Sequence, residues 1–226
     1  FPEKSDSLFF FRLNIFKFSD IALVISSIYI FCYSLLVSDK RWCIIQVVIW
    51  KIIHWVVLGG LLFAQSRSKI YTNWFTRHGR PLYEAFDNWK SLYNYSITIN
   101  CVIFIACCIR YFDLEDIYDI INKNHYEISI FFTHSKFLAC FTSGIALIFI
   151  NFVVLKWTYD SSGDFSWYYG DFFVNDDNLI KKKSLCYNGI YRFLNNPELV
   201  TGYLGYYGCA LLCRSWSIFF LALLSQ

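Results

Sequence analysis

Four stretches of this chain are apolar enough, and nearly or fully long enough, to cross a lipid bilayer as helices: residues 21–37, 42–64, 95–110 and 137–157. A spanning helix needs about 20 mostly apolar residues. Hydrophobic residues make up 57% of the 226 residues and charged residues 16%, whereas soluble proteins have about 45–50% and about 25%. The aromatic share of 22% is more than a soluble core of this size buries. These features predict an all-α fold, a polytopic transmembrane helix bundle.

A fifth apolar stretch begins at Leu199 and contains Arg214. A cation inside the bilayer is costly, and the polar segment Cys213–Ser217 interrupts the stretch. We therefore predict a terminal helical hairpin whose second helix is cut short at Gln226. The alternative is one long helix whose arginine side chain reaches the membrane surface. The chain contains no Met and begins at Phe1 without a signal peptide, so we expect an internal fragment of a longer protein.

The basic residues indicate how the spans are oriented. Most of them lie in the N-terminal segment and in the loops 65–94 and 158–198. Cytoplasmic loops near span ends retain lysine and arginine, so we place these loops in the cytosol. The net charge of only +3 gives no reason to expect nucleic acid as a partner.

The first of these loops contains an amphipathic pattern. Apolar and aromatic residues recur at helical spacing from Leu82 to Tyr93, and charged residues take the opposite face. This pattern predicts an interfacial helix near 80–93. We divide the chain into residues 1–157, which hold the spans and this helix, and residues 158–226, which hold the candidate chemistry and the hairpin.

Glycine, acidic and aromatic residues concentrate between Asp160 and Gly208. Three glycines stand three residues apart at the start of the last apolar stretch and would leave a groove along one helix face: Gly202, Gly205 and Gly208. Such a groove admits either a neighbouring helix, which is the commoner use, or a ligand. Pro197 predicts a turn just before it, because proline cannot continue a helix interior. That turn would present Asn195, Asn196 and Glu198 to the groove.

An aromatic run precedes this region: Phe165, Trp167, Tyr168, Tyr169, Phe172 and Phe173. Two interpretations stay open. The rings could anchor the chain at the depth of the lipid headgroups. Alternatively, they could hold a sulfonium or ammonium cation by cation–π attraction, with Asp164 and Asp171 adding negative charge.

Two polar residues lie inside the second apolar run, Lys51 and His54. Such residues either bind a phosphate headgroup or pair within the bundle, and we favour pairing. The histidines in loops lack metal-ligand spacing, so no metal site is expected: His78, His125 and His134.

The ordered motifs resemble the fungal phosphatidylethanolamine N-methyltransferase family. The motifs are Gly-Asp-Phe-Phe at 170–173, Gly-Ile-Tyr-Arg-Phe-Leu-Asn-Asn-Pro-Glu at 189–198, the glycine-spaced span with Leu211 and Ser215, and the segment 72–90. The asparagine–proline turn is shared more loosely with the isoprenylcysteine carboxyl methyltransferases. However, Asn195 and Asn196 stand where the wider superfamily often has Arg-His.

The resemblance implies a multi-pass enzyme of the endoplasmic reticulum membrane, of which this chain is a part. It implies transfer of a methyl group from S-adenosylmethionine to phosphatidylethanolamine, giving the N-monomethyl lipid in phosphatidylcholine biosynthesis. The cofactor would contact Tyr169, Gly170, Asp171, Asn196, Pro197, Gly202 and Gly205. Glu198 or Asp171 would accept the proton of the lipid amine. The alternatives are an isoprenylcysteine carboxyl methyltransferase-like enzyme, or a non-catalytic receptor or transporter subunit.

Overall fold

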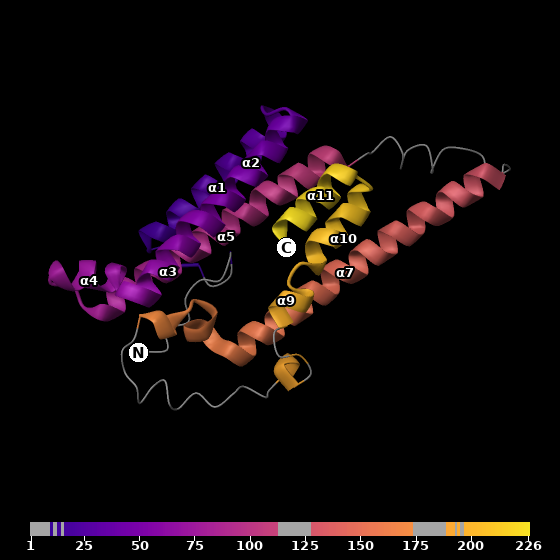
Figure 1. The fold of residues 1–226 in the computed structure, drawn as a ribbon. Helices are drawn as coiled ribbons and strands as arrows, with labels where there is room; N and C mark the ends of the chain where they lie inside the picture. The colour runs from indigo at the N-terminus through magenta and orange to yellow at the C-terminus, as the bar shows by residue number, and fades with distance from the viewer. Residues whose placement is uncertain are drawn as a thin grey trace.

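The computed structural model describes residues 10, 13, 14, 16–112, 128–173, 189–192, 194 and 197–226. Every regular element in these residues is helical, as expected. The long elements are α1 (Phe18–Leu36), α2 (Lys40–Ile52), α3 (Gly59–Ser68), α5 (Leu82–Tyr111) and α7 (Ile128–Trp167). The short helices are α4 (Ile70–Arg77), α9 (Pro197–Thr201), α10 (Leu204–Cys213) and α11 (Trp216–Ser225). Figure 1 shows α1, α2 and α5 side by side, and α10 and α11 between α5 and α7.

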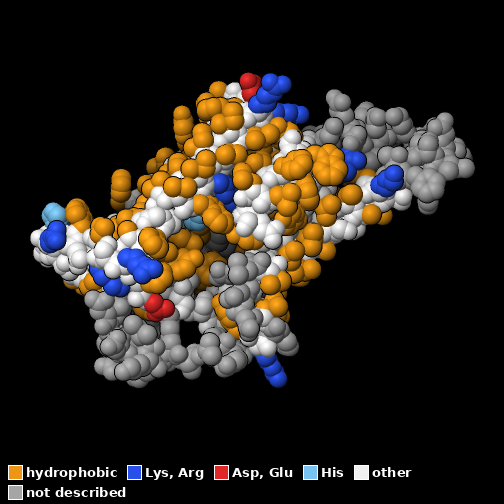
Figure 2. All heavy atoms as spheres, viewed as in Figure 1, with side chains coloured by type: hydrophobic (Ala, Val, Ile, Leu, Met, Phe, Trp, Pro, Cys, Tyr) orange, Lys and Arg blue, Asp and Glu red, His pale blue; other side chains and the backbone are white. Residues whose placement is uncertain are grey.

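Four helical segments are long and apolar enough to cross a membrane: Phe18–Leu36, Lys40–Ser68, Leu82–Tyr111 and Ser135–Phe172. They match the four predicted runs, so the prediction of a multi-span helix bundle is confirmed. Apolar side chains cover much of the surface, and charged ones gather near the ends (Figure 2). The second span is one continuous helical path, because a π-helix, η1 (Ile53–Leu58), joins α2 to α3. In a π-helix the hydrogen bonds run to the fifth residue along the chain, and such turns are frequent at functional sites.

The first core lies between α1, α2, α5, α10 and α11. Its fully buried residues include Leu23, Val47, Ile99, Ile103 and Ile218. The eight described cysteines are all free, and four of them are buried here or nearby, which agrees with their reading as small apolar residues. This core holds both halves of the chain together.

Arg110 caps the C-terminal end of α1. Its guanidinium donates hydrogen bonds to the carbonyl oxygens of Leu35, at 3.0 Å, and Ser38. These carbonyls lie at the end of a helix, where the backbone has no partners of its own and the dipole is negative. A charge that sequence alone would place at the membrane boundary therefore serves as a cap for a neighbouring helix.

The last apolar stretch forms two helices that pack on each other, and not one long helix. Arg214 has φ 49°, in the left-handed region, and ends α10. The chain then reverses, so that the hydroxyl of Tyr207 is hydrogen-bonded to Gln226 at the far end of α11. The Arg214 guanidinium lies 5.2 Å from the Phe137 ring centroid on α7. Each helix has 10 residues, or about 15 Å at 1.5 Å per residue, which is too short to cross alone.

The predicted interfacial helix near 80–93 is the start of α5, continuous with the third span. Phe86 and Trp89 on its apolar face are 3% and 1% exposed, because they pack against protein. The helix that extends beyond the bundle is α4 (Figure 1), where Ile70 and Trp74 are more than half exposed. The period of the sequence therefore identified the apolar face, and the structure identifies what covers it.

Candidate active site

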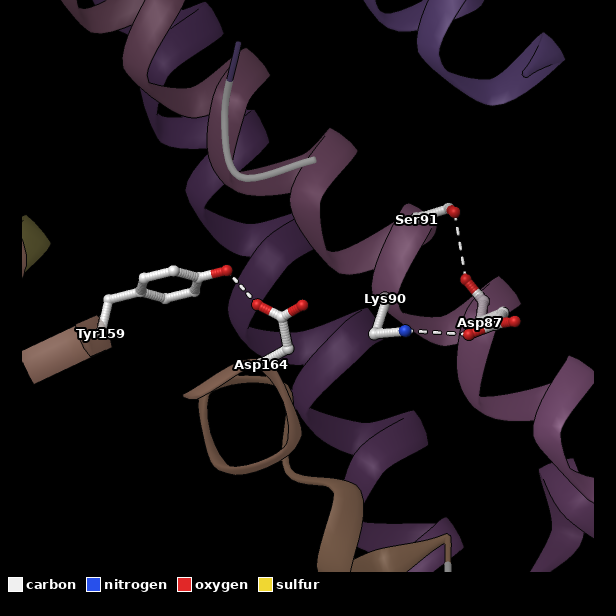
Figure 3. Close-up of polar contacts among 5 residues, drawn as sticks. All are labelled: Asp87, Lys90, Ser91, Tyr159 and Asp164. Carbon is white, nitrogen blue, oxygen red and sulfur yellow. Dashed lines mark hydrogen bonds and ion pairs between the residues drawn. The ribbon is translucent and has the colours of Figure 1, made fainter. Parts of the chain in front are cut away.

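The C-terminal end of α7 turns sharply at Gly163. This residue has φ 69° and ψ 171°, a combination that is essentially restricted to glycine. Just beyond it, Asp164 accepts a hydrogen bond from the Tyr159 hydroxyl (Figure 3). Asp164 also accepts, through its carbonyl oxygen, a bond of 3.1 Å from the Tyr168 amide. The turn directs residues 164–173 away from the α7 axis and toward α3 and α5.

Replacing Gly163 with alanine should destabilise the protein by about 1–3 kcal/mol, because the new Cβ makes this backbone conformation strained. Gly59→Ala is the matched control, since Gly59 lies in a helix and a Cβ there meets nothing within 4 Å. The control should be neutral or slightly stabilising. Thermal unfolding of the detergent-solubilised parent protein measures both. Equal melting temperatures for the two variants would contradict this account of the turn.

The Gly-Asp-Phe-Phe motif forms a tight turn at one end of the helix bundle. Gly170 begins a short 3-10 helix, η2 (Gly170–Phe172), and is buried under the Phe165 ring, which a Cβ at this position would strike. The carbonyl oxygen of Phe172 accepts hydrogen bonds from Lys69 Nζ at 2.7 Å and Gln65 Nε2 at 3.0 Å. The motif is therefore fixed by α3 and by the residue that follows it.

Two of the segments that carry the family resemblance, 72–90 and 170–173, pack together. Trp89 Nε1 donates a 2.9 Å hydrogen bond to the carbonyl oxygen of Tyr168. The Phe173 ring lies 5.6–6.0 Å from the rings of Phe86, Trp89 and Tyr71. Burial raises the pKa of Tyr71, whose hydroxyl donates to Asn88. Segments 72–90 and 170–173 thus form a single aromatic cluster.

The residues of the aromatic run differ in how far they are buried. Tyr168 and Phe173 are 1% exposed and belong to the protein interior, so they neither anchor the chain in headgroups nor receive a ligand. Tyr169 differs, with φ 59° and 38% of its surface exposed. Its ring is parallel to that of Phe172, at an interplanar angle of 4° and a centroid distance of 6.2 Å. Tyr169 and Phe172, with half-buried Asp171 between them, are the part that suits a cation.

The charged side chains near this cluster form contacts within the protein. Lys90, which is 8% exposed, pairs with Asp87 at 2.8 Å and lies 5.0 Å from the Phe86 ring centroid. The Ser91 hydroxyl donates a 3.0 Å bond to the Asp87 carbonyl oxygen (Figure 3). Asp87 and Asp164 therefore both have partners within the protein.

The second predicted segment packs along the side of α7. Pro197 is buried and begins α9, and the Thr201 carbonyl oxygen accepts a 2.8 Å hydrogen bond from Asn151 Nδ2. A Cβ at Gly205 would lie 2.6 Å from Asn151 Oδ1, and one at Gly208 would lie 2.8 Å from Ile148 Cγ1. Gly205 and Gly208 therefore pack against α7, as the helix-packing alternative expects.

Three predicted residues are wholly or partly outside the described part of the structure, and Asn195 is the first of them. Asn196 lies outside the described residues, as does the side chain of Glu198, whose backbone belongs to α9. Gly202 is half-buried between α9 and α10. Asn151 and Gly163 are 12 residues apart on α7, or about 18 Å at 1.5 Å per residue.

Asn151 is a site residue that the sequence reasoning did not single out. The available signal was an amide side chain inside the apolar run 137–157, since polar residues within spans are rare and have partners. Here the partner is the backbone where α9 ends, so Asn151 fixes the level of the Pro197–Gly205 segment on α7.

Comparison with known proteins supports the resemblance. Residues 139–226 match the phospholipid methyltransferase family. The whole chain is 30% identical over 231 residues to a phosphatidylethanolamine N-methyltransferase of Schizosaccharomyces pombe and 31% identical over 229 residues to that of Schizosaccharomyces japonicus. It is 32% identical over 216 residues, 94% of the chain, to that of Sordaria macrospora.

The chain covers only 23%, 24% and 20% of the length of these three relatives, which agrees with the expectation of a fragment. No solved structure matches the chain significantly. The chain is thus similar along its whole length to the fungal phosphatidylethanolamine N-methyltransferases, and its residues 139–226 match the phospholipid methyltransferase family.

Proposed function

We propose that this chain is the membrane-embedded part of an enzyme that methylates the amine of phosphatidylethanolamine. The methyl donor is S-adenosylmethionine, the product is the N-monomethyl lipid in phosphatidylcholine synthesis, and the location is the endoplasmic reticulum membrane. The observation that carries the proposal is the packing of segments 72–90 and 170–173 into one aromatic cluster. Relatives bearing the name of this activity favour it over methylation of a prenylated cysteine.

The residues around Tyr169 suit this chemistry. The faces of aromatic rings attract cations, and Asp171 adds a negative charge beside the parallel rings of Tyr169 and Phe172. A sulfonium is such a cation. We assign Tyr169, Gly170 and Asp171 to one end of the cofactor, and Asn196, Pro197, Gly202 and Gly205 to the other. Because the glycine face of α10 is covered by Asn151 and Ile148, Gly202 and Gly205 would contribute backbone and not an open groove.

The reaction itself is a displacement at carbon. The neutral lipid amine forms a bond to the methyl carbon while the carbon–sulfur bond breaks, and the sulfur keeps the electron pair as a neutral thioether. The ammonium form of the substrate must first lose a proton, which Asp171 or Glu198 accepts directly or through water. Alignment of the two reactants and exclusion of water supply much of the acceleration. Burial of this end by the aromatic cluster provides a rigid support for that alignment.

Activity tests the proposal directly. Membranes containing the full-length parent protein, with labelled S-adenosylmethionine, should convert phosphatidylethanolamine to its monomethyl form. Absence of labelled lipid beside an active control enzyme would overturn the proposed function.

Substitution of Tyr169 tests where the cofactor binds. Tyr169→Ala should reduce kcat/KM for S-adenosylmethionine about tenfold, as expected for loss of a cation–π contact worth about 1–2 kcal/mol. Tyr169→Phe keeps the ring and should retain most activity. Tyr83→Ala is the control, because Tyr83 is also an exposed tyrosine but lies on the first turn of α5. Equal activity of Tyr169→Ala and the control would remove Tyr169 from the site.

A further inference from the structure

A lysine is buried deep in the second span. Lys51 lies 11 residues after the start of the span Lys40–Ser68, or about 16 Å along the helix, and is only 9% exposed. Its Nζ donates a 3.2 Å hydrogen bond to the Tyr206 hydroxyl on α10 and lies 4.5 Å from the ring centroid of the same tyrosine. A buried lysine at such a depth costs several kcal/mol unless something compensates it.

Among the described residues, no carboxylate pairs with Lys51. The sequence has no Asp or Glu in residues 40–83, 88–112 or 199–226, which include every residue of α2, α3, α10 and α11 and most of α5. Asp20, the buried acid of α1, accepts a 2.9 Å hydrogen bond from the backbone N–H of Asn14. A buried charge without a charged partner is strongly destabilising, and an anion from outside the chain can supply that partner.

Further polar groups lead from Lys51 toward Tyr169. His54 follows Lys51 by three residues, so the two side chains neighbour each other at about 5–6 Å between Cβ atoms. His54 Nδ1 is 3.0 Å from Ser96 Oγ, and the His54 ring centroid is 5.3 Å from that of Tyr93. The Tyr93 ring is in turn 5.8 Å from Tyr169. The central face has a recess with blue and pale blue side chains at its edge (Figure 2).

We propose that Lys51 and Tyr206 bind the phosphate of a phospholipid that enters the bundle from the surrounding bilayer. The phosphate receives hydrogen bonds from the ammonium of Lys51 and the hydroxyl of Tyr206. Its head group then extends past His54 toward Tyr169, while the acyl chains remain among the apolar side chains of the spans. Lipid phosphates are anionic and reach this depth with their own hydrocarbon, which a free solute does not. The identity of the lipid as phosphatidylethanolamine rests on the proposed function.

Lipid binding is the primary test, because it needs no catalytic activity. Spin-labelled phosphatidic acid is the probe, with the full-length parent in detergent micelles. Lys51→Met should weaken binding at least tenfold, and Tyr206→Phe several-fold. Lys156→Met is the matched control, because Lys156 also lies in an apolar span but is exposed. Replacing a buried charge with an apolar side chain of similar size is usually tolerated, so the variant should fold, and its melting temperature verifies this.

The competitors distinguish the sources of phosphate. Unlabelled phosphatidic acid should displace the probe, whereas diacylglycerol, which lacks phosphate, and millimolar inorganic phosphate should not. In the methylation assay, Lys51→Met should raise KM for phosphatidylethanolamine and leave kcat nearly unchanged, as loss of uniform binding does. Equal probe affinity in wild type, Lys51→Met and Lys156→Met would overturn the phosphate site. An inactive parent that still binds the probe through Lys51 would instead overturn the proposed function alone.

Discussion

Trp89→Ala should lower the free energy of unfolding by about 3–5 kcal/mol, the usual cost of truncating a large buried aromatic side chain. Trp89 is 1% exposed, contacts Tyr71, Tyr93 and Phe173, and donates to the Tyr168 carbonyl oxygen. Its loss therefore leaves a cavity and an unpaired acceptor at once. Thermal unfolding of the solubilised parent protein measures the effect.

The control for this variant is Trp74→Ala, because Trp74 is 54% exposed on α4. Its melting temperature should remain close to that of the wild type. Trp89→Phe keeps one six-membered ring but removes the pyrrole ring with its N–H donor, so it should cost less than Trp89→Ala, about 1–3 kcal/mol. If Trp89→Ala and Trp74→Ala unfold together, the aromatic cluster does not hold the two motifs as described.

Gly208→Leu should have an effect of similar size, at or above about 3 kcal/mol, the upper end of the usual cost of overpacking. At this crossing of α7 and α10, a Cβ on Gly208 would lie 2.7 Å from the Gly144 carbonyl oxygen, and a Cβ on Gly144 would lie 2.8 Å from the Gly208 carbonyl oxygen. Both obstacles are backbone, so no side-chain rotation relieves the clash. The two helices must separate.

The measurement is the fraction of monodisperse protein after solubilisation, together with its melting temperature. Gly60→Leu is the matched control, because Gly60 is also helical and a Cβ there meets nothing within 4 Å. It should behave as the wild type. Wild-type behaviour of Gly208→Leu would mean that α10 does not cross α7 at these glycines.

The spans could be predicted because their length and hydrophobicity are local properties of the sequence. The break at Arg214 followed from the same reasoning, since a cation inside an apolar stretch favours a chain reversal. The partner of each helix face is not a local property. The period from Leu82 to Tyr93 marks an apolar face equally well for lipid and for protein, and only the structure places Tyr168 and Phe173 against it.

The candidate site shows the same division. Pro197 was found from residue type, because proline constrains the backbone, whereas the Gly170 motif was found through the family resemblance. The glycine spacing was compatible with a groove and, more commonly, with a helix seam, and the choice depends on Ile148 and Asn151, more than 50 residues earlier. The reversal at Gly163 was not predicted either, because a single glycine near a helix end gives no direction to the chain that follows.

The π-helix Ile53–Leu58 has a consequence for relatives with one residue fewer in this segment. An α-helix turns by about 100° for each residue, and a π-helix, whose hydrogen bonds run to the fifth residue, turns by less. The π-helix therefore takes up an additional residue while the helix on its two sides stays aligned. In this chain Lys51 before the π-helix faces Tyr206, and Gln65 after it faces the Phe172 carbonyl oxygen. A homologue in which this segment is one residue shorter and wholly α-helical could therefore keep both contacts.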